Sequence, residues 1–251
     1  MKIFELDSRR TLILPGNHDE TIKYAVEHWV KCANQAIQAR GSFVVALSGG
    51  STPKKIFQEL STNYKKSVDW QKVYLFWSDE RPLPPDSPDS NYHMAMTEAG
   101  LSTLPIPIQQ IYRMVAEKDI EQNAAAYEAK IRELVKGAQF DLVMLGMGDD
   151  GHTASLFPNT DALKETEKLV IANHVAQKNC WRMTFTYTCI NQARAICLYV
   201  IGANKAEILQ KVLLSPFDKT TYPSQNVGTQ DHKATWIIDD AASKNILVNL
   251  G

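Results

Sequence analysis

The chain lacks any apolar run long enough to cross a membrane, and it lacks an excess of charge of either sign. No window of its 251 residues approaches the roughly 18 apolar residues that a membrane span requires. Lys and Arg total 27 against 28 Asp and Glu, so no overall field attracts nucleic acid or an anionic membrane surface. We therefore expect no nucleic-acid and no membrane partner, and any bound anion must be held by a local site.

Cysteine is scarce, and its spacing carries no metal or disulfide pattern. The four cysteines, Cys32, Cys180, Cys189 and Cys197, form no Cys-x-x-Cys pair, and the six histidines form no His-x-x-x-His pair. This argues against a zinc site and favours reduced, mostly buried thiols. The first ten residues carry charges throughout and lack the apolar core of a signal peptide, so we expect a cytoplasmic protein.

Apolar strands alternate with amphipathic helices along the chain. The composition, 44% hydrophobic and 22% charged, is ordinary for a globular protein, and no linker, repeat or low-complexity tract interrupts it. The expected strands are residues 11–14, 43–47, 73–77, 141–145, 168–173, 182–189, 196–202 and 235–238. This rhythm predicts an α/β fold with a mostly parallel sheet and helices on both faces, in a single domain over residues 1–251.

Helix signals lie between these strands. Asn17 and Glu20 have the spacing of a capping box, and apolar residues then recur at helical spacing until Gly41. Asp119 with Gln122 predicts a second cap, for a helix that runs through residue 135. Further helices are expected at residues 53–60, 91–99 and 205–214.

The segment from Phe140 to Pro158 carries the strongest functional signal. An apolar strand runs into a glycine turn that holds Asp149, Asp150 and His152. Glycine lets backbone approach a ligand, and a carboxylate two residues from an imidazole can orient it as a proton acceptor near neutral pH. We predict that His152 and Asp150 are catalytic and act on a small molecule.

The same turn matches the Gly-x-Gly-x-x-Gly pattern of dinucleotide-binding folds through Gly146, Gly148 and Gly151. That pattern needs a long helix whose N-terminus faces a pyrophosphate, and Pro158 follows too closely to allow one. Two adjacent aspartates would also place negative charge where the pyrophosphate lies. We therefore reject a dinucleotide site and keep open a plain surface turn as the alternative to a catalytic one.

Residues 48–52, Ser-Gly-Gly-Ser-Thr, lie between an expected strand and an expected helix that begins at Pro53. They offer unhindered backbone N–H groups and hydroxyls at a helix N-terminus, which suits a single phosphate. The spacing is not that of a Walker A loop, and a tight turn with a capping Thr52 is the structural alternative. The predicted phosphate-binding residues are Ser48, Gly49, Gly50, Ser51 and Thr52.

Four charged side chains at strand ends complete the candidate site. Lys205 opens a helix, where a cation needs an anionic partner, and is predicted to bind the phosphate unless it is simply solvated. Arg182 heads a strand and could bind phosphate or carboxylate, with a surface ion pair as the alternative. Asp79 and Arg81 precede a proline-stiffened loop and are predicted to contact substrate, or else to form an internal salt bridge.

Taken together, these residues resemble 6-phosphogluconolactonase in the glucosamine-6-phosphate isomerase/6-phosphogluconolactonase family. The motifs lie in order along almost the whole chain: Leu47-Ser-Gly-Gly-Ser-Thr-Pro53, Trp77-Ser-Asp-Glu-Arg81, Ser90-Asn-Tyr92, Leu145 through Pro158, Arg182-Met-Thr, Gly202-x-x-Lys-Ala and Trp236-Ile-Ile-Asp-Asp. The resemblance implies a Rossmann-like fold, no metal and no organic cofactor. It also implies hydrolysis of 6-phospho-D-glucono-1,5-lactone, a phosphosugar lactone, in the pentose phosphate pathway, and we expect a monomer or weak homodimer.

Two alternative functions share most of these features. Glucosamine-6-phosphate deaminases resemble the chain in the Ser-Gly-Gly loop and the Asp-Gly-His turn, but they typically place a glutamate five residues after the histidine. Here that position is Phe157, which cannot transfer a proton, so the lactonase is favoured. A sugar-phosphate-binding regulator without catalysis is the other alternative, and the intact Asp150 and His152 argue against it.

Lactone hydrolysis assigns each predicted residue a hypothetical role. Neutral His152 takes a proton from water that attacks C1 and returns it to the ring oxygen, while Asp150 orients the imidazole. Residues 48–52 with Lys205 hold the phosphate, and Arg182 lies nearby. Backbone N–H groups of residues 146–151 are the expected donors to the oxyanion.

Overall fold

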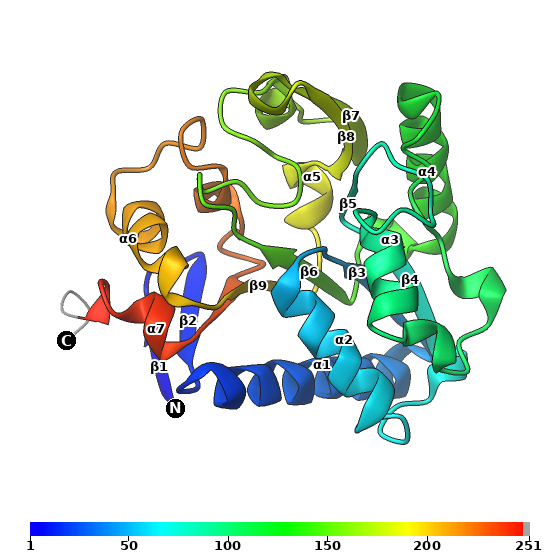
Figure 1. The fold of residues 1–251 in the computed structure, drawn as a ribbon, viewed down its shortest axis with the longest axis horizontal. Helices are drawn as coiled ribbons and strands as arrows, with labels where there is room; N and C mark the ends of the chain where they lie inside the picture. Colours follow the sequence, from blue (N-terminus) through cyan, green and yellow to red (C-terminus); the bar gives the residue numbers. More distant parts are fainter. Residues whose placement is uncertain (248–251) are drawn as a thin grey trace.

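A seven-stranded sheet forms the centre of the molecule in the computed structural model, which describes residues 1–247 (Figure 1). Its strand order is β1-β2-β10-β9-β6-β3-β4. The strands are β1 (Lys2–Glu5), β2 (Arg10–Leu14), β3 (Phe43–Leu47), β4 (Val73–Trp77), β6 (Leu142–Gly146), β9 (Ile196–Val200) and β10 (Ala234–Ile238). All neighbours pair in parallel except β1 with β2, so the expected mostly parallel sheet is confirmed.

Helices surround this sheet. They are α1 (His18–Arg40), α2 (Ser51–Thr62), α3 (Asn91–His93), α4 (Ile120–Leu134), α5 (Tyr187–Ile190), α6 (Ala206–Leu214) and α7 (Asp240–Ser243). A π-helical turn, Met94–Glu98, extends α3. Single 3₁₀ turns lie at Trp70–Lys72, Leu101–Thr103, Ile108–Gln110, Lys136–Ala138, Asp161–Lys164, Ala176–Lys178, Ala203–Lys205 and Pro223–Asn226. No helix within residues 1–247 combines the length and apolar character needed to span a membrane.

The long helix α1 begins and ends where the sequence predicts. The Asn17 side chain accepts hydrogen bonds from the first turn, and Glu20 Oε2 accepts one from Asn17 N at 2.9 Å, which completes the capping box. Gly41 ends the helix with a φ of 83°, a conformation that glycine adopts without strain. The apolar face of α1 packs against α2 and the sheet (Figure 1).

A second, antiparallel sheet of order β5-β8-β7 lies on the other side of the molecule from α1 (Figure 1). It consists of β5 (Asp79–Glu80), β7 (Val170–Val175) and β8 (Cys180–Phe185). The expected strand over residues 182–189 is therefore wrong at its end. Thr186 leaves the strand because its hydroxyl caps α5, where it accepts from Cys189 N at 3.3 Å.

Two further local features differ from what the sequence predicts. Strand β1 was not expected, because it has no alternating buried face and is held only along one edge by β2. The predicted cap at Asp119 is also wrong, since its backbone is left-handed with a φ of 41° and its side chain makes no capping hydrogen bond to α4.

The strand order brings three strand ends together at one edge of the sheet. Strand β3 lies between β4 and β6, so the chain leaves β3 on one side and returns on the other. In open α/β sheets, ligands bind outside the carboxyl ends of the strands at such a reversal. The loops that follow β3, β4 and β6 therefore form the expected place for a site.

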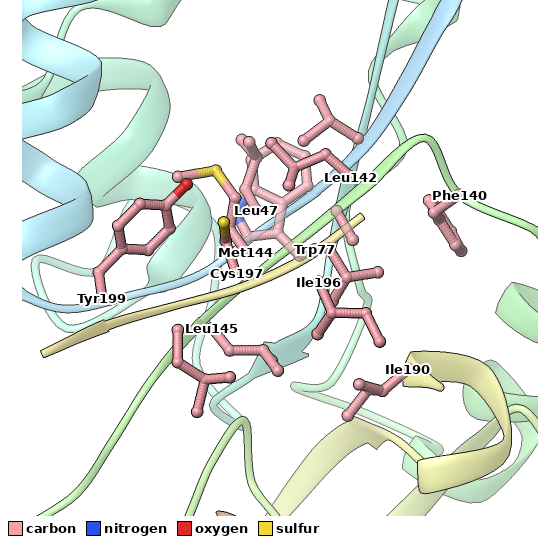
Figure 2. Packing of buried hydrophobic residues seen from close by; sticks show 14 of the residues in the cluster. Leu47, Trp77, Phe140, Leu142, Met144, Leu145, Ile190, Ile196, Cys197 and Tyr199 are labelled. Carbon is pink, nitrogen blue, oxygen red and sulfur yellow. The ribbon is translucent and has the colours of Figure 1, made fainter. Parts of the chain in front are cut away.

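These strand ends rest on a tightly packed core. Figure 2 shows Leu47, Trp77 and Leu145 among the buried hydrophobic side chains of this region, and all three are fully buried. Ser78 ties the ends of two strands together, since its hydroxyl donates to Leu47 O at 3.0 Å. The loops that leave these strands thus start from fixed positions.

A buried carboxylate fixes the opposite end of the same strands. Asp141 Oδ2 accepts from Val44 N at 2.8 Å, and Oδ1 accepts from Arg40 Nε at 2.8 Å. Arg194 Nε lies 3.5 Å from the same oxygen. Asp141 therefore links α1, β3 and the segment before β9, far from the carboxyl ends of the strands.

We predict that Asp141→Ala lowers the free energy of unfolding by about 2 kcal/mol, because charge-assisted hydrogen bonds to a buried group are lost. Urea denaturation followed by tryptophan fluorescence measures the change. The matched control is Asp161→Ala, which removes a fully exposed carboxylate paired with Lys164 and should change stability little. Equal losses in the two variants would contradict the role given to Asp141.

Candidate active site

A cavity of about 180 Å³ opens at the carboxyl ends of β3, β4 and β6. It is lined by Ser48, Gly49, Gly50, Asp79, Arg81, Asn91, Gly146, Met147, Gly148, His152 and Ala154. Among the residues predicted from sequence, the cavity brings together Ser48, Gly49, Gly50, Asp79, Arg81 and His152. Asp150, Ser51, Thr52, Lys205 and Arg182 lie outside this lining.

His152 and Asp150 form the central pair of the site. His152 Nδ1 lies 2.5 Å from Asp150 Oδ1, which also accepts from His152 N at 3.0 Å. Partial burial acts to raise the pKa of Asp150, but the hydrogen bonds from His152 outweigh it and hold that pKa below its usual 3.8. The contact engages Nδ1, so Nε2 is the ring nitrogen left to meet a water or substrate.

Gly148 makes this pair possible. A Cβ at Gly148 would lie 2.1 Å from His152 Nδ1 and 2.9 Å from Asp150 Oδ1, distances that no side chain tolerates. Gly148 N also donates to His152 O at 2.9 Å and closes the turn. Gly148, one of the three glycines that match the dinucleotide-binding pattern, is therefore needed for the close packing of the imidazole.

The residues after His152 anchor the turn to neighbouring strands. Thr153 Oγ1 donates to Gly146 O at 2.8 Å, and Ser155 Oγ donates to Asp79 Oδ2 at 2.7 Å. Ser155 N in turn donates to Thr184 Oγ1 on β8 at 3.1 Å. The small sheet and the central sheet are thus joined directly behind the cavity.

Asn91 is a lining residue that reasoning from residue chemistry missed, as were Met147 and Ala154. Its Nδ2 donates to Asp79 O at 3.0 Å, and its Oδ1 lies where a Cβ on Gly49 would be, only 1.9 Å away. Gly49 must therefore be glycine so that the amide can lie over it. The only sequence signal for Asn91 is its place in the Ser90-Asn-Tyr motif that supports the family resemblance.

Glu80 holds both ends of the loop that carries Arg81. Its buried carboxylate accepts from Arg81 N, Asn91 N and Tyr92 N, each at 2.8 Å, and from the Ser90 hydroxyl at 3.1 Å. Burial raises the pKa of Glu80, although the backbone hydrogen bonds act to lower it. The Arg81 guanidinium also donates back to the loop at Asp89 O, so the loop is closed on itself.

Helix α2 begins at the cavity without a side-chain cap. Its N-cap residue is Gly50, which has a φ of 100° and no side chain to accept from the first turn. Ser51 and Thr52 form that first turn and lie outside the cavity lining, so Thr52 does not act as the cap. Uncapped N–H groups at the positive end of a helix dipole are available to an anion.

The two remaining predicted cations have partners elsewhere. Lys205 Nζ pairs with Asp149 Oδ1 at 2.5 Å, next to the His152 turn. Arg182 Nη1 donates to Cys180 Sγ and to Trp181 O, both at 2.9 Å, on β8. Lys205 is thus adjacent to the site, whereas the structure does not bring Arg182 into the cavity.

A larger cavity of about 890 Å³ lies between α4 and β7. Half of its charged residues are paired with one another, Arg132 with Glu128 and Lys164 with Asp161. It contains no residue pair arranged for proton transfer, so we place the chemistry in the smaller cavity. Within residues 1–247, no cluster of three or more His, Cys, Asp or Glu side chains could hold a metal ion.

Comparison with known proteins agrees with the resemblance seen in the sequence. The family of glucosamine-6-phosphate isomerases/6-phosphogluconolactonase matches residues 16–236. The chain belongs to this family.

Individual members of this family are similar over nearly the whole chain. The 6-phosphogluconolactonase of Chlamydia trachomatis serovar D is 39% identical over 249 residues, which cover 99% of this chain and 95% of the relative. The 6-phosphogluconolactonase structure from Trypanosoma cruzi has a TM-score of 0.81 at 28% identity, covering 94% of this chain and 96% of the other. A monomeric glucosamine-6-phosphate deaminase shares the fold, with a TM-score of 0.78 at 19% identity over 93% and 99% of the two chains.

The lowered pKa of Asp150 predicts a specific pH dependence of stability. Because this pKa is lower in the folded than in the unfolded chain, ionised Asp150 stabilises the fold above its usual pKa of 3.8. That stabilisation disappears as the pH falls through the folded pKa. We expect wild type and Asp150→Asn to differ in free energy of unfolding near about pH 6 and to converge once the pH lies below the folded pKa, in urea titrations.

The exposed Asp231 provides the control for this experiment. Asp231→Asn should show no difference from wild type that disappears on acidification. A difference for Asp150→Asn that stays constant over the whole pH range would show that its ionisation does not stabilise the fold.

Proposed function

We propose that this protein hydrolyses 6-phospho-D-glucono-1,5-lactone to 6-phospho-D-gluconate, a step of the oxidative pentose phosphate pathway. The observation that carries the proposal is the His152 imidazole, which Asp150 holds at the wall of a cavity formed by three strand ends. The similarity to 6-phosphogluconolactonases over nearly the full chain supports this choice among the chemistries that such a cavity could perform.

In the proposed mechanism His152 transfers protons at Nε2. Neutral His152 removes a proton from the water that attacks C1 of the lactone and then donates it to the departing ring oxygen. Asp150, which contacts Nδ1, fixes the tautomer and stabilises the imidazolium that forms between these steps. Both steps use the same nitrogen, so the substrate must place C1 and the ring oxygen within its reach.

The developing oxyanion needs hydrogen-bond donors near the same point. Two of the backbone N–H groups in the turn of residues 146–151 are already used, since Gly148 N donates to His152 O and Gly151 N donates to Gly148 O. We therefore assign the oxyanion contact to the other N–H groups of this turn, with Arg81 as a further donor that lines the same cavity.

The phosphate binds at the N-terminus of α2 in this proposal. Residues 48–52 offer uncapped backbone N–H groups and hydroxyls there, and Lys205 supplies a charge when it exchanges Asp149 for the phosphate. Asp79, held by Asn91 and Ser155, accepts hydrogen bonds from sugar hydroxyls. Arg182 joins the phosphate only if its guanidinium leaves Cys180, and we rank it below Lys205.

We predict that His152→Ala lowers kcat about 10²- to 10⁴-fold while the protein still binds 6-phosphogluconate, because general-base catalysis is lost and the phosphate contacts remain. The assay follows acid release from freshly prepared lactone, with the spontaneous rate subtracted. Ammonia release from glucosamine 6-phosphate is measured in parallel and should be absent.

The exposed His174 on β7 provides the control, since His174→Ala removes an imidazole outside the cavity. It should retain wild-type turnover. Near-normal turnover of His152→Ala, or ammonia release by the wild type, would overturn the proposed function.

Lys205→Ala should raise KM about 10- to 100-fold with little change in kcat, because a charge-assisted hydrogen bond to the phosphate is lost. Unphosphorylated gluconolactone should show the same KM with both proteins. Lys164→Ala is the matched control, since Lys164 also pairs with an aspartate but lines the larger cavity instead. An unchanged KM for the phosphorylated lactone would remove Lys205 from the phosphate site.

A further inference from the structure

The ring of Phe157 lies flat against the His152 imidazole. The two ring centres are 3.9 Å apart, and the ring planes differ by 24°. Phe157 is 3% exposed and does not line the cavity, whereas His152 does. An apolar ring thus covers one face of an imidazole that reaches the cavity.

Phe157 is itself held from several directions. Its carbonyl accepts from Thr160 Oγ1 at 2.8 Å, and the neighbouring Pro158 O accepts from Gln177 Nε2 at 3.3 Å. Lys178 Nζ lies 5.6 Å from the centre of the Phe157 ring. The turn between β7 and β8, Ala176–Lys178, therefore packs over the segment that carries Phe157.

These contacts constrain the imidazole in ways that Asp150 alone does not. The hydrogen bond to Asp150 restrains Nδ1, but a single hydrogen bond tolerates a range of angles and so leaves the ring plane some freedom to tilt through small changes in χ1 and χ2. Gly148 limits the ring along its edge, where a Cβ would meet Cε1 at 2.1 Å. Stacking on Phe157 fixes the remaining variable, which is the plane of the ring and hence the direction of Nε2.

We propose that Phe157 is a positioning residue for lactone hydrolysis, which keeps His152 Nε2 aimed at the water and the ring oxygen. The proposal rests on the function proposed above, because it concerns the same imidazole. It also gives the small sheet a role in the reaction, since the β7–β8 turn supports Phe157. Phe157 does not touch substrate and acts only through His152.

The central test is a double-mutant cycle between Phe157 and His152. Phe157→Leu keeps an apolar side chain but removes the stack, and should lower kcat about 10- to 100-fold with little change in KM, as expected when a catalytic group is misaligned. In a His152→Ala background the same substitution should cost nothing further, because there is no imidazole left to position.

Two variants separate positioning from general destabilisation. Phe157→Tyr retains a stacking ring and should recover most of the kcat lost by Phe157→Leu. Phe43→Leu removes a fully buried phenylalanine at the start of β3, away from the cavity, and should lower thermal stability without lowering kcat. Proton NMR of the His152 ring gives an independent readout, since loss of the Phe157 ring current should shift its resonances downfield.

The outcomes distinguish the two proposals. If His152→Ala retains turnover, the proposed function itself fails. If His152→Ala is inactive but Phe157→Leu leaves kcat unchanged, or lowers the residual rate of His152→Ala by the same factor as in wild type, the function stands and the positioning role is wrong. A downfield shift of the His152 resonances together with a non-additive cycle supports the positioning role.

Discussion

The close packing of the His152 imidazole against its own turn is the constraint on which the site depends. The contact with Asp150 requires that nothing larger than hydrogen occupy the α-carbon of Gly148. A glycine turn this tight has little stiffness of its own, because glycine restricts its backbone least of all residues. The stiffness comes from the residues that follow, where Thr153 and Ser155 connect the turn to β6 and Asp79.

The order of the strands determines which loops can meet this turn. Because β3 lies between β4 and β6, the start of α2 and the loop at Asp79 both open onto the same cavity as His152. The second sheet adds contacts that hold Asp79 and Ser155 in place. Through β5 and β8 it fixes Asp79 from one side, and through Thr184 it fixes Ser155 from the other. In the proposed mechanism, proton transfer and substrate orientation therefore depend on contacts between the two sheets.

Features that depend on neighbouring residues could be predicted, and features that depend on distant pairing could not. The capping box of α1, the strands of the central sheet other than β1 and the Asp150–His152 pair follow from spacings of a few residues. Asn91 fits over Gly49 only after β3 and the loop behind β5 are assembled. Likewise, the pairing of Lys205 with Asp149 joins distant parts of the chain, and no local pattern encodes it.

The cavity is lined by hydrogen-bond acceptors as well as donors. Within residues 1–247 the hydrogen-bond donors to Asp79 and Glu80 are all neutral, namely backbone N–H groups, hydroxyls and one amide. These carboxylates are therefore satisfied by neutral donors, and Asp79, the one of the two that lines the cavity, keeps further lone pairs for hydrogen bonds to whatever enters it. The uncapped start of α2 has the opposite polarity. Under the proposed function, a substrate with one anionic end and one hydroxyl-rich end is accordingly favoured in a single orientation, with its phosphate at α2 and its hydroxyls at Asp79.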